Sequence, residues 1–118
     1  MMIRLYTGQD GESHFEEISP PYAWDRDAER APLESATGII FSRSPVGYFI
    51  DWHNAPRRQY VIILAGEVEY RIGDGSTRRL GPGDVLLAED LTGRGHTTRV
   101  VGDRPRLSAT IPLASPLP

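Results

Sequence analysis

Two histidines are the residues of this chain whose type and position are best suited to chemistry. His53 ends an alternating segment just before Asn54, and His96 follows a polar, glycine-rich loop at 89–95. An imidazole has an unperturbed pKa of about 6.5, so it can serve as a general acid or base near neutral pH, and it is also a common metal ligand. We take His53 and His96 as candidate catalytic residues facing one pocket. The third histidine, His14, is interpreted as structural.

Three carboxylates lie close in sequence to these histidines. Alternation along the strand expected at 48–53 places Asp51 on the same face as His53, and Glu89 and Asp90 precede His96. Two imidazoles with one carboxylate are typical of non-haem iron sites. The alternative is that these acids are solvated charges. The chain has no cysteine and no lysine, so thiolate ligands and Schiff-base chemistry on its own side chains are excluded.

A binding pocket also needs side chains that line it and a charged group that binds the ligand. Trp52, Tyr60 and Tyr70 are candidates to line a pocket for an apolar or ring-shaped ligand, with core packing as the alternative. Arg57 and Arg58 follow the turn after His53 on opposite faces, so at most one points inward. An inward Arg58 would bind a carboxylate or phosphate in bidentate fashion, and the alternative is a solvated position at the rim.

Composition restricts the classes of function. A length of 118 residues is typical of one domain, and we expect an N-terminal hairpin and arm (1–34), a barrel core (35–113) and a tail (114–118). A net charge of −3 with scattered arginines differs from that of nucleic-acid-binding domains. No apolar run approaches the ~20 residues of a membrane span, and the first residues are too polar for a signal peptide, so we expect a cytoplasmic protein.

The 12 glycines and 10 prolines divide the chain into short apolar segments, which is typical of an all-β protein. Residues 19–34 differ from the rest. Pro20 and Pro21 extend the start of this segment, residues 23–31 are predicted to form two turns of helix, and Pro32 blocks its continuation. We interpret this segment as an arm that lies across the barrel and is held by Tyr22 and Trp24. The arm could serve as a lid over the pocket or as a contact to a partner subunit, and the alternative is that it only covers the surface. Strands are expected at 3–6, 14–18, 36–41, 48–53, 59–64, 67–72, 77–80, 85–88, 96–101 and 106–111.

The spacing of glycine and histidine resembles that of the cupin superfamily. The first cupin motif is a Gly, five residues, a His, any residue, a second His, three or four residues, a Glu, six residues and a Gly. Gly47, His53 and Gly66 fall on this motif, whereas Ala55 stands at the second His and Gln59 at the Glu. The resemblance covers about residues 35–113 and implies a cupin-type jelly roll (double-stranded β-helix), a single antiparallel β-barrel with little helix.

The second cupin motif matches in part. Gly83 opens it and His96 occupies its His position, while Leu91 replaces its Pro and Val100 its Asn, with two extra residues between. The match at both ends implies the same fold and is less informative about activity.

The resemblance also implies a ligand set. In metal-dependent cupins three His and one Glu bind the metal, and this chain keeps His53 and His96 at two of those positions. Ala55 cannot bind a metal, and the amide oxygen of Gln59 is a poor substitute for a carboxylate. With Asp51 as a further donor, the implied cofactor is none or a weakly bound divalent Fe, Mn, Ni or Zn.

Three functions remain open at this point. The favoured one is a small-molecule-binding single-domain cupin with a degenerate metal site, similar to small bacterial cupins of unassigned function. The second is a metal-dependent dioxygenase or isomerase using His53, His96 and a substitute carboxylate. Without metal, the two histidines could act as acid and base, as in the sugar epimerases of the superfamily. The third is a homodimeric interaction module built on the arm or a sheet edge.

Overall fold

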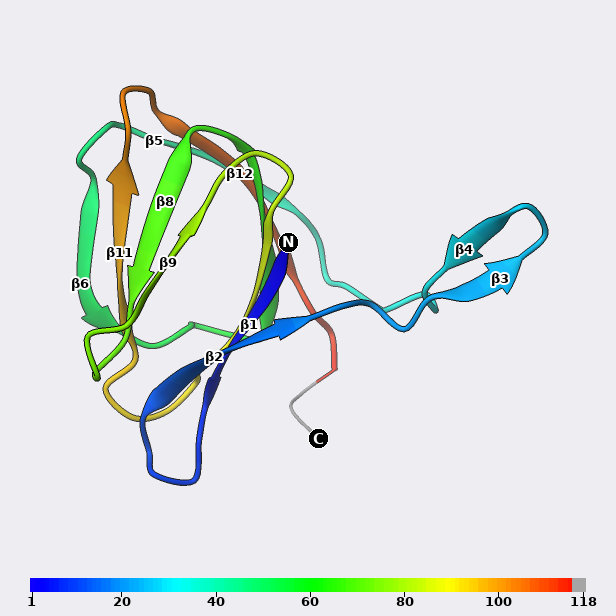
Figure 1. Ribbon diagram of the computed structural model, residues 1–118, viewed down its shortest axis with the longest axis horizontal. Helices are drawn as coiled ribbons and strands as arrows, with labels where there is room; N and C mark the ends of the chain where they lie inside the picture. The colour runs from blue at the N-terminus through cyan, green and yellow to red at the C-terminus, as the bar shows by residue number, and fades with distance from the viewer. Residues whose placement is uncertain (116–118) are drawn as a thin grey trace.

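The computed structural model describes residues 1–115, and all regular structure in them is β-strand, which confirms the all-β prediction (Figure 1). Of the predicted tail at 114–118, residues 116–118 lie outside the described residues. The described part of the chain contains no helix of the length and apolarity needed to cross a membrane. The strands are β1 (Met2–Thr7), β2 (Ser13–Ile18), β3 (Ala23–Asp25), β4 (Ala28–Arg30), β5 (Ile40–Ser44), β6 (Phe49–His53), β7 (Gln59–Ala65), β8 (Glu67–Arg71), β9 (Thr77–Leu80), β10 (Val85–Glu89), β11 (His96–Val101) and β12 (Arg106–Pro112).

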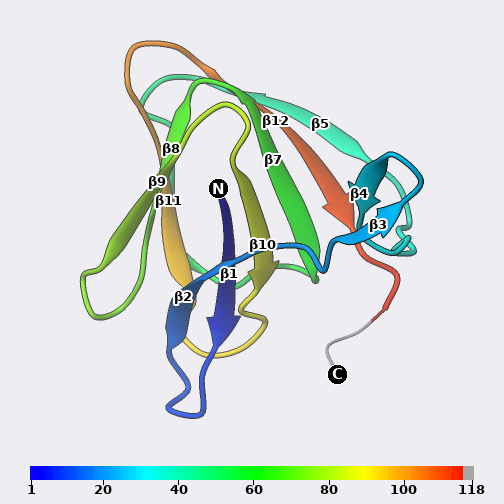
Figure 2. The ribbon, with the colours of Figure 1, turned by 45° about the vertical axis from the view of Figure 1, so that its right-hand side comes forward.

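Two sheets face each other across the core (Figure 2). The larger sheet has six strands in the order β2-β1-β10-β7-β12-β5, and the smaller has four in the order β6-β11-β8-β9. Strands β1 and β10 pair in parallel, and the remaining pairs of both sheets are antiparallel. Within residues 1–115 no hydrogen-bonded strand pair joins the two sheets, so the predicted closure into a single barrel is not confirmed.

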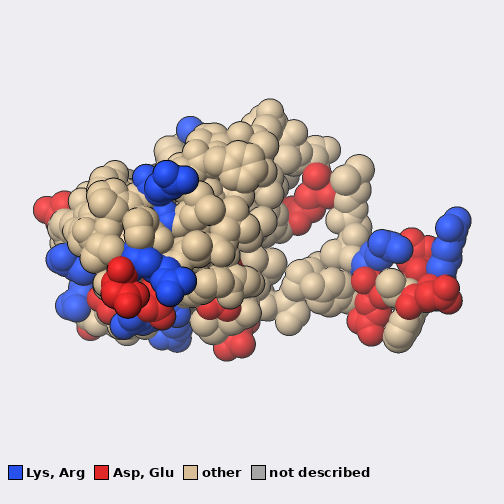
Figure 3. Space-filling model, turned by 90° about the horizontal axis from the view of Figure 1, so that it is seen from above, with Lys and Arg blue, Asp and Glu red and all other residues tan. Residues whose placement is uncertain are grey.

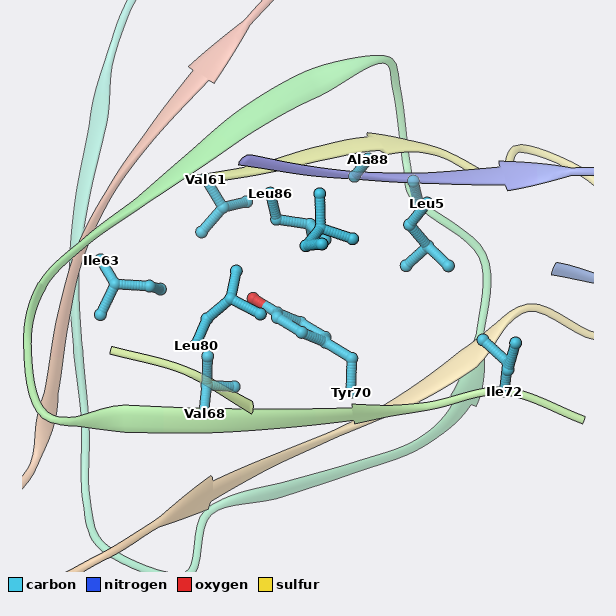
Figure 4. Packing of buried hydrophobic residues seen from close by; sticks show 11 residues of the cluster. Leu5, Val61, Ile63, Val68, Tyr70, Ile72, Leu80, Leu86 and Ala88 are labelled. Carbon is cyan, nitrogen blue, oxygen red and sulfur yellow. The ribbon is translucent and has the colours of Figure 1, made fainter. Parts of the chain in front are cut away.

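The core fills the space between the two sheets (Figure 4). Alternation in β7 turns Val61 and Ile63 inward, and alternation in β8 turns Val68 and Tyr70 inward to meet them. Burial of each large apolar side chain contributes roughly 1.5–3 kcal/mol. The chain passes directly from one sheet to the other at Gly66, where φ is 75°. A Cβ there would lie 2.3 Å from the carbonyl oxygen of Pro105, so only glycine fits this crossing.

The segment predicted as an arm contains a hairpin instead of a helix. Strands β3 and β4 pair through Trp24 and Glu29, and Arg26 turns the chain between them with a φ of 62°. The prediction of helix at 23–31 was wrong, because a helix this short needs a partner surface, and this hairpin projects away from the sheets (Figure 1). Tyr22 and Trp24 are 57% and 74% exposed, so they do not hold the arm across the body as predicted.

Candidate functional site

His53 and His96 lie side by side between the two sheets. Strands β6 and β11 pair these two residues directly, and their ring centroids are 4.3 Å apart with an interplanar angle of 56°. Gly95 makes this approach possible, because it has a φ of 80° and its missing Cβ would lie 1.9 Å from the carbonyl oxygen of His53. The two imidazoles, 43 positions apart in the chain, therefore belong to one site.

The site is a cavity of about 140 Å³ between the sheets. Of the residues predicted for a site, four line it: His53, Gln59, Tyr70 and His96. The remaining lining residues are Ser42, Ile50, Ala55, Pro56, Val61, Leu86, Ala88, Thr98, Arg106, Ser108 and Thr110. The cavity therefore has a mixed lining of short apolar side chains, hydroxyl groups, two imidazoles and one guanidinium.

Asp51 and Trp52 do not face this cavity, contrary to prediction. They lie on the outer side of the four-stranded sheet, where both line a shallow hollow and Trp52 lies under the guanidinium of Arg94. The reason is an irregularity in the pairing of β6 with β11. His96 pairs with His53 and Thr98 with Ile50, so three steps along β6 match two along β11. This bulge turns both Ile50 and His53 inward and carries Asp51 outward.

Arg58 and Tyr60 also lie outside the cavity, so they do not line the site as predicted. The Arg58 guanidinium binds the carboxylate of Glu89, which also accepts a 2.6 Å hydrogen bond from Arg4 Nε. Tyr60 donates its hydroxyl to the carboxylate of Glu34, and burial with this hydrogen bond raises the pKa of Tyr60 to about 12. Glu89, 3% exposed, is thus held by two arginines away from the histidines.

Asp90 is fully buried directly behind His96. Its Oδ2 accepts hydrogen bonds from Nδ1 of His96 at 2.6 Å and from the hydroxyl of Ser13 at 2.8 Å. His53 uses its own Nδ1 to donate to the backbone carbonyl of Asp51 at 2.8 Å. Both rings are therefore oriented through Nδ1, which leaves Nε2 of each as the nitrogen for a ligand. Desolvation by burial lowers the pKa of His53, with the hydrogen bond to Asp51 opposing it, so this ring favours the neutral form.

These donors do not fit a tightly bound divalent metal. Within residues 1–115 no three His, Asp or Glu side chains come together in a group able to hold a metal ion. Ala55 lines the cavity where a second histidine would stand, and Gln59 offers only a neutral amide oxygen. Among these residues no carboxylate lines the cavity, so the predicted substitutes Asp51, Glu89 and Asp90 do not complete a ligand set.

Sequence reasoning missed the polar residues of β12. Arg106, Ser108 and Thr110 share the face that lines the cavity, at the two-residue spacing of a strand. The alternating apolar residues Leu107, Ala109 and Ile111 drew attention instead, because an apolar face usually packs inward. The polar alternation Arg-Ser-Thr was a visible signal that β12 presents polar groups to an interior site.

Comparisons with known proteins agree with this geometry. No protein-family model matches the chain. It is 36% identical over 67 residues to dimethylsulfoniopropionate lyase DddQ of Ruegeria pomeroyi. These residues cover 57% of this chain and 32% of that protein. The chain thus spans about a third of the length of this curated relative. The crystal structure of the same lyase matches 65% of this chain and 38% of its own, at 30% identity and a TM-score of 0.54.

Two further crystal structures share the fold. A protein from Klebsiella pneumoniae with a double-stranded β-helix domain matches at 24% identity and a TM-score of 0.53, over 70% of this chain and 67% of its own. An RmlC-like cupin family protein from Methanocaldococcus jannaschii matches at 14% identity and a TM-score of 0.55, over 83% of this chain and 93% of its own. Its two facing sheets and these similar structures show that the chain has the double-stranded β-helix fold found in cupins, with His53 and His96 at positions that resemble the cupin motifs.

Proposed function

We propose that this protein binds a small organic molecule in the cavity between its sheets and holds no tightly bound metal there. The observation that carries the proposal is the pair of imidazoles, His53 and His96, facing a cavity of about 140 Å³. Each ring is oriented through Nδ1, so its Nε2 is available to a ligand hydroxyl, amine or acidic C–H. Apolar side chains such as Val61 and Leu86 would contact the body of the ligand.

A second candidate function is catalysis in the same cavity. The similarity to a dimethylsulfoniopropionate lyase favours it, and so does the contact between His96 and the buried carboxylate of Asp90. A carboxylate on Nδ1 stabilises the protonated imidazole that forms when Nε2 accepts a proton. His53, whose pKa is lowered, would accept a proton from a bound substrate at neutral pH. This candidate function requires turnover as well as binding. It is tested by incubating the protein with a set of small organic acids and measuring whether any of them is consumed.

The degenerate metal site gives a direct test. Protein purified without chelator is expected to hold well under one equivalent of transition metal by elemental analysis, because only two strong ligands remain. Restoring the cupin set with Ala55→His and Gln59→Glu is expected to create a zinc site at least ~100-fold tighter, since structural sites use four ligands. Gln59→Glu alone is the matched control. A stoichiometric, tightly held metal in the unaltered protein would contradict the proposal.

The protonation of His53 gives a second test. Burial lowers the pKa of His53 below 6.5, so histidine NMR titration is expected to show His53 neutral where exposed histidines are already protonated. The unfolded chain binds this proton more readily, and therefore the contribution to stability is complete above about pH 6.5 and is lost as the pH falls. His53→Gln, which cannot titrate, is expected to lose that pH dependence. A pKa of His53 above 6.5 would contradict the argument.

We also propose that the outer face of the six-stranded sheet is the contact between two copies of the chain. A row of apolar residues, Ile62, Ala109 and Phe41, crosses β7, β12 and β5 on this face. Phe41 is 67% exposed and Ile62 is half-buried, whereas Ala109 between them is 5% exposed and adds no accessible surface. Leu64, 46% exposed, extends the row. Apolar clusters of this kind are typical of homodimer interfaces. The charged tip of the β3–β4 hairpin stands apart from the body (Figure 3), in position to reach past the sheet edge toward a second copy.

Analytical ultracentrifugation tests this proposal. The unaltered chain is expected to sediment as a dimer at micromolar concentration. Phe41→Arg or Leu64→Arg is expected to weaken the dimer by at least about tenfold, because each places an unpaired charge in an apolar contact. Val46→Arg is the matched control, since Val46 is 48% exposed but lies in the turn after β5. A monomeric unaltered chain would overturn the proposal.

A further inference from the structure

The guanidinium of Arg106 is the unusual group in the cavity. Arg106 is only 9% exposed, it lines the cavity from the start of β12, and its Nε is buried without a hydrogen-bond partner. Its Nη2 donates a 3.3 Å hydrogen bond to the hydroxyl of Ser44, and the guanidinium also lies against the phenol of Tyr70. Among residues 1–115 no carboxylate forms an ion pair with it. A permanently charged group is thus held in the interior with its Nε unpaired and without a carboxylate partner among the described residues.

Other buried or half-buried arginines of this chain are treated differently. Arg4 and Arg58 both bind the carboxylate of Glu89, which compensates their charges within the fold. A buried cation without a partner costs several kcal/mol, and arginine cannot escape this cost by losing its proton. The missing partner of Arg106 would therefore be an anion that enters the cavity from outside.

The cavity defines the size and charge of that anion. Arg106 is the only Arg, Asp or Glu among the lining residues, so this one positive charge favours a ligand group with a single negative charge. Cavities of about 150 Å³ accommodate a molecule the size of benzene. The planar fork of a guanidinium matches a carboxylate in bidentate geometry.

Strand register places the anion relative to the histidines. β12 pairs Leu107 with Ala65 and Pro112 with Gln59, so Arg106 enters from the end of β7 opposite to Gln59. Tyr70 lies between the two ends, and its ring centroid is 5.9 Å from that of His96. Its phenol is close to Arg106, because the guanidinium opposes the rise in the pKa of Tyr70 that burial causes. A short molecule would thus present one end to Arg106 and the other to the imidazoles.

We propose that the ligand of this cavity is a small monocarboxylate whose carboxylate group binds Arg106, with its other end at His53 and His96. This inference rests on the proposed small-molecule function and specifies its ligand class. Dimethylsulfoniopropionate, the compound in the name of the relative from Ruegeria pomeroyi, carries one carboxylate and also a sulfonium cation, so propionate is the simpler probe of this proposal.

Calorimetric titration of the full chain tests the proposal with propionate, dimethylsulfoniopropionate, the neutral isostere propionamide and inorganic phosphate. At least one of the two carboxylates is expected to bind with a dissociation constant of about 1 mM or tighter. Arg106→Met, which keeps the stem and removes the charge, is expected to weaken that binding by at least ~10-fold. Arg106→Lys is expected to recover only part of it. Arg104→Met removes an exposed arginine two positions away and is expected to bind like the unaltered protein.

Thermal unfolding separates a ligand-binding role from a structural one. Arg106→Met is expected to be at least as stable as the unaltered protein without ligand, because it removes an uncompensated buried charge. Unchanged carboxylate binding in Arg106→Met would overturn the inference, and so would tighter, Arg106-dependent binding of phosphate. Binding of propionamide without either carboxylate would overturn the inference and leave the proposed function intact. If none of the four compounds shifts the NMR signals of cavity residues, the inference is wrong. A broad screen of small molecules with the same NMR readout then shows whether the cavity binds any small molecule, which tests the proposed function separately.

Discussion

Replacement of Gly95 by alanine is expected to reduce the free energy of unfolding by about 3 kcal/mol or more. Gly95 has a φ of 80°, which costs an alanine about 1–3 kcal/mol. The added Cβ would also lie 1.9 Å from the carbonyl oxygen of His53 and 3.0 Å from the amide nitrogen of Asn54. The backbone of β6 would have to move away from β11, which separates His53 from His96. Thermal unfolding should show a drop in melting temperature of roughly 10 °C.

Gly47→Ala is the matched control for this variant. Gly47 has nearly the same φ, 82°, but no heavy atom lies within 4 Å of the position of its missing Cβ. Gly47→Ala is therefore expected to lower the free energy of unfolding by only about 1 kcal/mol, the cost of a positive φ for alanine. If both variants lose the same free energy of unfolding, the close approach of Gly95 to β6 is not the reason that a glycine is needed at position 95.

Replacement of Asp90 by alanine is the other change with a large expected effect, about 3 kcal/mol in the free energy of unfolding. It leaves two buried donors, Nδ1 of His96 and the hydroxyl of Ser13, without their acceptor. An unpaired buried polar group costs about 1–3 kcal/mol, and this carboxylate joins the start of β2 to the start of β11. Ligand binding is expected to weaken as well, because His96 loses the contact that orients its ring.

Ser13→Ala is the companion variant, because it removes one of the two donors and keeps the contact between Asp90 and His96. Its expected cost is about 1 kcal/mol with ligand binding unchanged. Chemical denaturation of both variants and of the double variant measures the coupling between these groups. If Asp90→Ala costs no more than Ser13→Ala, the carboxylate does not support His96 in the way the geometry indicates.

Local patterns in the sequence were sufficient for the fold class and for the two histidines. Alternation at 67–72 predicted β8, and Gly47 and Gly66, which fall on the first cupin motif, both have positive φ in the structure. The resemblance also located His53 and His96, and the structure places them in one cavity. These features were predictable because strand period and turn chemistry depend on residues that are close in sequence.

The predictions that failed depended on pairing between distant segments. The helix predicted at 23–31 is a hairpin, since a short segment takes its conformation from its surroundings as much as from its propensity. Asp51 and Trp52 lie on the outer face because one bulge in the pairing of β6 with β11 shifts the alternation.

By itself the sequence determined an all-β chain with two histidines at positions that resemble the cupin motifs, and with Ala55 and Gln59 where the first motif has His and Glu. Only the tertiary structure decided which face of each strand is interior, and so assigned Arg106 to the cavity and Arg58 to an ion pair with Glu89 outside the cavity. The physical reason is that the two faces of a strand have the same local geometry. Which face is buried depends on the register with neighbouring strands and on the sheet that packs against it.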